Sequence, residues 1–130
     1  MATHKELLIP VALLAAAVLF GAAEGPLSYA KDVEPIVVAE CTDCHGAKHP
    51  KASLDLSPGR GFGVLSGAKS QQVDMPLLKP GDPAGSYLWL KLAHTATQGK
   101  GMPKTMFGAK KLPDAELQLI QRWIVEGAKP

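Results

Sequence analysis

The sequence predicts an all-α domain of about three to four short helices joined by long loops. Three segments, at residues 29–40, 81–94 and 112–128, carry apolar residues at helical spacing. The chain also contains 13 glycines and 11 prolines, which favours ordered loops over regular elements. Its 130 residues, 46% apolar and 5% aromatic, fit one domain with a modest core that a further rigid group would help to complete.

The N-terminal segment differs in kind from the rest of the chain. Residues 7–23 form a run of 17 residues without a charge that ends in small residues. Such a run is typical of an export segment. As a helix it would be about 26 Å long, short of the ~30 Å hydrocarbon core, which favours a cleaved signal peptide at residues 1–23 over a retained membrane anchor. We therefore expect residues 24–130 to form a domain in the periplasm or otherwise outside the cytoplasm.

Residues 29–40 are expected to form the first helix. Ser28 is a suitable N-cap, and Val33 and Val37 lie four residues apart on one helical face. Pro35 lies too deep in the segment to keep every backbone hydrogen bond, so the helix is expected to begin later or to bend there.

This helix leads into the segment CTDCH, which contains both cysteines of the chain, Cys41 and Cys44, and ends at His45. On a helical turn all three side chains would leave from one face. Two thiols so placed can add to the two vinyl groups of a haem while the imidazole binds the iron, and this spacing is typical of haem c attachment. We therefore predict one covalently bound haem c, with His45 as the first iron ligand.

Three alternatives remain open for these cysteines. A thioredoxin-like redox pair would need a βαβ context that the sequence lacks. A zinc site would need four ligands, and His49 is the only further donor nearby. A structural disulfide is common in exported proteins, but it would leave His45 without a role.

Residues 81–94 are expected to form a short and almost fully buried helix. Asp82 is a suitable cap with Pro83 at the first helical position, and the residues that follow are nearly all apolar. His94 would lie at the C-terminal end, where a partly positive imidazole is favoured by the helix dipole.

The sixth position on the iron has several candidate ligands. They are Met75, Met102, Met106, His49 and His94. His49 follows His45 by four residues and would have to cross the macrocycle, so we expect it on the surface. Met75 is expected to be a buried wall residue. Met102 lies on a loop between glycine and proline, which holds its sulfur outside any regular element, so it is the predicted ligand and Met106 is its nearest rival.

Residues 112–128 are expected to form the last helix. It would begin near Pro113 and end at Gly127, with two acidic residues in its first turn. One face carries Leu117, Ile120, Trp123 and Ile124. We expect this face to pack against the first helix and the edge of the haem.

Taken in this order, the segments resemble the class I c-type cytochromes, the short monohaem modules of exported bacterial electron-transfer proteins. The resemblance covers residues 28–128 and includes CTDCHG, KPGDPAGSYLWLKL, GMP and the last helical segment. It implies the class I cytochrome c fold, with the last helix crossing the first, both cysteines in thioether bonds, and His45 and Met102 as axial ligands. The chain departs from its relatives at Lys104, where many of them have a second proline.

These features predict an electron carrier, alone or as a subunit of a larger membrane-associated complex, rather than an enzyme. Two strong axial ligands leave no open position on the iron for a substrate. The alternatives are a haem enzyme or gas sensor with an open or weakly held sixth position, and a structural module that keeps the haem to complete its core. The net charge of +2 does not indicate nucleic acid. Lysines 100, 104, 110 and 111 instead predict redox partner proteins, donor and acceptor, with an acidic docking surface.

Overall fold

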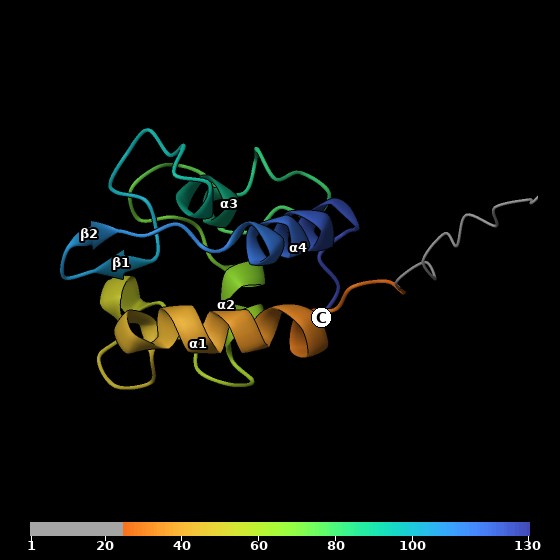
Figure 1. Ribbon diagram of the computed structural model, residues 1–130, viewed down its shortest axis with the longest axis horizontal. Coiled ribbons are helices and arrows are strands. Elements are labelled where there is room, and N and C mark those ends of the chain that lie inside the picture. Colours follow the sequence, from red (N-terminus) through yellow and green to blue (C-terminus); the bar gives the residue numbers. More distant parts are fainter. Residues whose placement is uncertain (1–24) are drawn as a thin grey trace, which may run out of the picture.

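The computed structural model describes residues 25–130, so the export segment expected at residues 1–23 lies outside the described part. Short helices joined by long loops make up most of the fold, with one small antiparallel β pair (Figure 1). The elements are η1 (Tyr29–Val33), α1 (Glu34–His45), η2 (Lys51–Ser53), α2 (Gly61–Gly67), α3 (Tyr87–Leu92), β1 (Lys104–Thr105), β2 (Gly108–Ala109) and α4 (Asp114–Val125). Within residues 25–130, no helix has both the length and the apolar character needed to cross a membrane.

The first helical segment begins as predicted, with Ser28 as its N-cap. The Ser28 hydroxyl oxygen accepts a hydrogen bond from Lys31 N (3.3 Å), and the Asp32 carboxylate accepts one from Ser28 N (2.8 Å). This reciprocal pair satisfies two backbone donors of the first turn. Pro35 has no N–H to donate, and the chain before it winds as the π-helical turn η1, with α1 starting at Glu34. The predicted disturbance at Pro35 is confirmed.

The core joins the two ends of the described chain. The ring of Tyr29 in η1 contacts Trp123 in α4 and Phe62 in α2, with centroid distances of 5.6 and 5.7 Å. The carbonyl of Lys129 accepts hydrogen bonds from Tyr29 N (2.9 Å) and Trp123 Nε1 (2.8 Å). The apolar face predicted for α4 is therefore confirmed as core, and the C-terminus lies beside the start of the first helical segment (Figure 1).

The middle helix is shorter than predicted. It begins at Tyr87, and the prediction that Asp82 caps it is wrong. The residues between them form a turn in which the Asp82 carboxylate accepts from Gly85 N (2.9 Å) and the Ser86 hydroxyl donates to the Asp82 carbonyl (2.9 Å). These local side-chain hydrogen bonds compete with the backbone bonds of a helical turn, so the helix starts only after them.

Four elements were not predicted from the sequence, namely η2, α2, β1 and β2. The helix α2 contains three glycines and has a weak intrinsic preference for helix. It is stabilised by burial, since Leu65 on its inner face is 1% exposed. The pair β1–β2 forms a hairpin that projects at the end of the molecule opposite the C-terminus (Figure 1), with Gly108 at φ 121° providing the left-handed backbone that this turn requires. The fold is mostly helical, as predicted, but it is not purely α.

Candidate functional site

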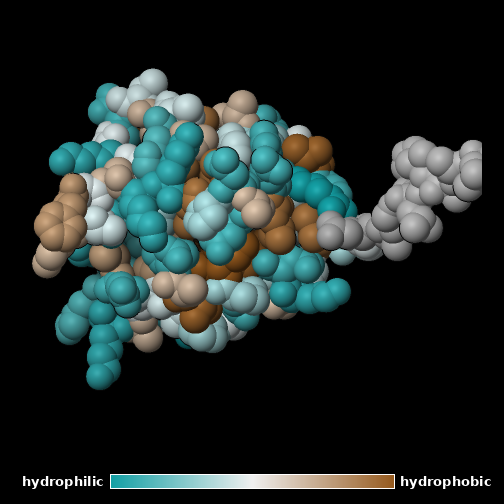
Figure 2. Space-filling model, in the orientation of Figure 1, coloured by the Kyte–Doolittle hydropathy of each residue, from teal (hydrophilic) through white to brown (hydrophobic). Residues whose placement is uncertain are grey.

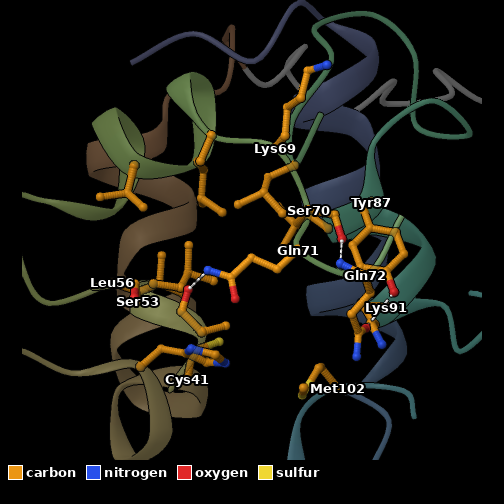
Figure 3. Close-up of a pocket in the computed structure, with 18 of the residues that line it drawn as sticks. Cys41, Ser53, Leu56, Lys69, Ser70, Gln71, Gln72, Tyr87, Lys91 and Met102 are labelled. Carbon is orange, nitrogen blue, oxygen red and sulfur yellow. Dashed lines mark hydrogen bonds between the residues drawn. The ribbon is translucent and has the colours of Figure 1, made fainter. Parts of the chain in front are cut away.

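A cavity of about 600 Å³ is bounded by α1, α2 and α3. Its aliphatic lining side chains are Leu54, Leu56, Val64, Leu65, Leu77, Leu88 and Leu92. Cys41 and His45 line it from α1, and Met102 lines it from the opposite side (Figure 3). This volume and this apolar lining are typical of a pocket for a ligand of cofactor size.

His45 lies in the last turn of α1 with its imidazole held in one tautomer. Its Nδ1 is 2.9 Å from the carbonyl oxygen of Lys51, and because a carbonyl can only accept, Nδ1 donates. Nε2 is then left with its lone pair available for a metal. This is the arrangement in which a ligating histidine is oriented by a backbone carbonyl on its other ring nitrogen.

Cys41 and Cys44 lie one turn apart on α1, half-buried and free as thiols. Burial raises the pKa of the Cys41 thiol to about 11, with further upward contributions from Glu40 and Cys44. Reactive redox cysteines have lowered thiol pKa values, so this environment disfavours the thioredoxin-like alternative. Cys41 lines the cavity itself, whereas Cys44 is not among the lining residues.

Met102 is held in the cavity wall by hydrogen bonds from its own backbone. Its N–H donates to the Lys91 carbonyl (2.9 Å), and its carbonyl accepts from His94 Nε2 (3.1 Å). Gly101 makes the second bond possible, because a side chain at this position would overlap the imidazole of His94. His94 was expected to stabilise the end of the middle helix, but it lies beyond that helix and anchors the methionine loop instead.

The other candidate ligands lie away from the cavity. Met106 is 89% exposed in the turn of the β1–β2 hairpin. His49 is exposed on the surface, as predicted. Met75 is only half-buried and does not line the cavity, so its prediction as a buried wall residue is wrong. Within the described residues, Met102 is thus the methionine that faces Cys41 and His45 across the cavity.

The cavity wall also contains a polar group of side chains that was not predicted from the sequence. Lys91 is only 8% exposed, and its ammonium donates to the carbonyls of Gln98 (2.9 Å) and Lys100 (3.0 Å). Beside it, the Tyr87 hydroxyl lies 2.7 Å from Gln72 Oε1 and 2.9 Å from the Gln98 carbonyl oxygen. The feature of the sequence that could have indicated this polar group is the lysine inside the apolar run YLWLKL.

These residues fit a haem c. One wall offers an imidazole nitrogen with its lone pair free and a neighbouring thiol, and the facing wall offers a thioether sulfur. The walls between them are mainly aliphatic, with Ser53, Lys69, Ser70 and Gln71 as further polar lining residues. The polar group at Lys91 and Tyr87 lies at the wall that carries Met102 (Figure 3). Imidazole and thioether ligands within an apolar shell are the donors of a low-spin haem iron.

A family model matches part of the chain. A family model described as Planctomycete cytochrome C matches residues 41–105, which is half of the chain. The matched part begins at the first cysteine of the CTDCH motif and extends past Met102. No curated protein and no solved structure matches the chain.

Proposed function

The chain belongs to the Planctomycete cytochrome C family, and we propose that it carries single electrons between redox partners outside the cytoplasm. The observation that supports this most strongly is the apolar cavity with Cys41 and His45 on one wall and Met102 on the other. A haem c bound there would supply an iron that takes up one electron from a donor and passes it to an acceptor.

Each residue has a distinct role in this proposal. Cys41 and Cys44 would form the two thioether bonds, and His45 would bind the iron through Nε2, since its Nδ1 donates to the Lys51 carbonyl. Met102, which lines the facing wall of the cavity, would supply the second iron ligand. We further propose that the helices adopt the class I cytochrome c arrangement, and that residues 1–23 direct export, with cleavage favoured over a retained anchor.

The ligand assignment can be tested by absorption spectroscopy of protein exported from cells that have a haem-maturation system. We expect the reduced protein to have a sharp low-spin α band, and the oxidised protein to have the weak far-red band of methionine bound to iron. Met102→Ala should lose this far-red band, because it removes the only thioether of the described residues that lies in the cavity wall. Met106→Ala is the matched control and should keep the band, since Met106 is 89% exposed.

Other outcomes would assign the site differently. Loss of the band only in Met106→Ala would move the ligand to the hairpin and keep the carrier function. A high-spin spectrum with immediate uptake of CO by the reduced wild-type protein would contradict the carrier function, and the haem enzyme or gas sensor would replace it.

The proposed docking surface lies around the β1–β2 hairpin. Met106 and Phe107 at its turn are 89% and 94% exposed, and the lysines predicted to face a partner are exposed around it. These are Lys100, Lys104, Lys110 and Lys111. In Figure 2 a small apolar group protrudes among hydrophilic side chains at this end of the molecule. An apolar tip with a basic rim is complementary to a redox protein that has an acidic rim around its own apolar contact.

Removing charge from this rim should slow association with an acidic partner. We expect Lys104→Gln/Lys110→Gln to reduce the association rate with an acidic blue-copper protein by about tenfold at low ionic strength, and to flatten its dependence on salt. The control Lys31→Gln/Lys129→Gln removes the same charge near the two ends of the described chain. Stopped-flow electron transfer measures both. Equal salt dependence in the two double variants would argue against docking through the hairpin.

A further inference from the structure

Lys91 is a buried cation that has no anionic partner among the described residues. Its side chain lines the cavity, and the residue is 8% exposed. Within residues 25–130, no carboxylate forms an ion pair with its ammonium. Lys69, which lines the same cavity, differs on both counts, because its side chain is 73% exposed and its ammonium pairs with Asp74 at 3.0 Å.

In the part of the chain that the structure describes, one N–H group of the Lys91 ammonium has no hydrogen-bond acceptor. A lysine ammonium has three N–H groups, and two of them donate to the carbonyls of Gln98 and Lys100. A buried charge is costly unless it is both hydrogen-bonded and paired with an opposite charge. The carbonyls of Gln98 and Lys100 provide the hydrogen bonds but not the opposite charge. The remaining requirement is an anionic oxygen, and the open space beside the ammonium is the cavity.

The neighbouring groups make this wall of the cavity polar. The Tyr87 ring lies 5.1 Å from Lys91 Nζ, and the Tyr87 hydroxyl lies beside the amide of Gln72. The rest of the lining is mainly aliphatic, although Ser53, Lys69, Ser70 and Gln71 also line the cavity. A ligand that suits both is a flat apolar molecule with a carboxylate on one edge.

We propose that Lys91 binds a carboxylate of the haem, one of its two propionate side chains. The inference rests on the proposed function, since it requires a haem in this cavity. It assigns the polar edge of the haem to the wall formed by Lys91, Tyr87 and Gln72. It also makes Lys91 a link between the haem and the loop that carries Met102. The Lys91 carbonyl accepts a hydrogen bond from Met102 N (2.9 Å), and the Lys91 ammonium donates to the carbonyls of Gln98 and Lys100.

The pairing can be measured directly in the holoprotein. Growth with 5-aminolevulinate labelled with ¹³C at its carboxyl carbon labels the haem propionates, and growth with lysine labelled with ¹⁵N at Nζ labels the ammonium groups. Dipolar recoupling in solid-state NMR then detects a close carboxyl–ammonium contact in the reduced, diamagnetic protein. We expect the contact in wild type and in Lys69→Met, and its loss in Lys91→Arg, which keeps the positive charge but carries no label.

The reduction potential gives a second readout. Lys91→Met removes a positive charge beside the haem. Because the oxidised haem carries one more positive charge than the reduced haem, this removal favours the oxidised form, and the reduction potential should fall. The potentials of Lys69→Met and Lys91→Arg should stay near that of wild type. If Lys91→Met does not accumulate as holoprotein, the labelled wild type and Lys91→Arg still decide the question.

The outcomes separate this inference from the function on which it rests. Absence of the contact in haem-loaded wild type, or its persistence in Lys91→Arg, would overturn the role of Lys91 and leave the carrier function intact. An unchanged potential in Lys91→Met would also count against the pairing. Failure of the exported protein to incorporate labelled haem would instead overturn the proposed function.

Discussion

Replacement of both Cys41 and Cys44 by alanine is expected to abolish covalent attachment of haem. The two thiols lie one turn apart on α1, and each thioether bond requires one of these sulfur atoms. Acid–acetone treatment should then extract all haem from the double variant and none from wild type. Either single variant should retain haem through one thioether, with an α band shifted to longer wavelength because one vinyl group stays unsaturated.

The control for this experiment is Asp43→Ala, which changes an exposed residue between the two cysteines and keeps the spacing of the motif. It should bind haem covalently, like wild type. Haem that resists extraction from the double cysteine variant would show that the attachment lies elsewhere in the chain, and the assignment of the CTDCH segment would then be wrong.

Gly61→Ala is expected to destabilise the fold by about 1–3 kcal/mol, the usual cost of overpacking a core. A methyl group at this position would overlap the hydroxyl of Tyr29 and lie 3.0 Å from its Cζ. Tyr29 has little room to move, because its ring packs between Trp123 and Phe62 and the residue is 2% exposed. Denaturant unfolding of the holoprotein, followed by circular dichroism, measures the effect.

Gly63→Ala is the matched control in the same helix, α2. A methyl group there meets no atom of the described residues within 4 Å, apart from its chain neighbours and the backbone of its own helix. The variant should therefore be neutral or more stable by up to about 1 kcal/mol, since alanine favours helix. Tyr29→Phe should relieve part of the clash in Gly61→Ala. On its own it should cost little, because the buried Tyr29 hydroxyl has no hydrogen-bond partner within the described residues. Equal stability of Gly61→Ala and Gly63→Ala would contradict the close packing of Tyr29.

Local signals predicted some elements of the fold and failed for others. The start of the first helical segment and both ends of the last helix follow from caps, proline and glycine, which act within one turn of the chain. The middle helix was placed too early because the Asp82 carboxylate satisfies Gly85 N in a turn. The helix α2 was missed because its stability comes from burying Leu65 against distant segments rather than from its glycine-rich sequence.

Some features of the candidate site could likewise be predicted from local sequence, whereas others could not. The spacing of Cys41, Cys44 and His45 on α1 is a local property of one helix, so the sequence alone predicted these residues and the haem c that they would bind. Met102 was predicted as the distal ligand over Met106, and the structure adds that Met102 lines the cavity whereas Met106 is 89% exposed. The assignment of the iron ligands itself stays a prediction for spectroscopy to test.

By itself the sequence determined the CTDCH motif, the start of the first helical segment, the ends of the last helix and the membership of a c-type cytochrome family, because each depends on residues close together in the chain. Only the tertiary structure decided that His94 anchors the Met102 carbonyl and that Lys91 is buried beside the cavity. Both features depend on how the end of α3 packs against the loop after it. The spacing of apolar residues along the sequence does not predict contacts of this kind. A lysine within an apolar helix is stabilised by carbonyl groups that only the folded loop brings to it.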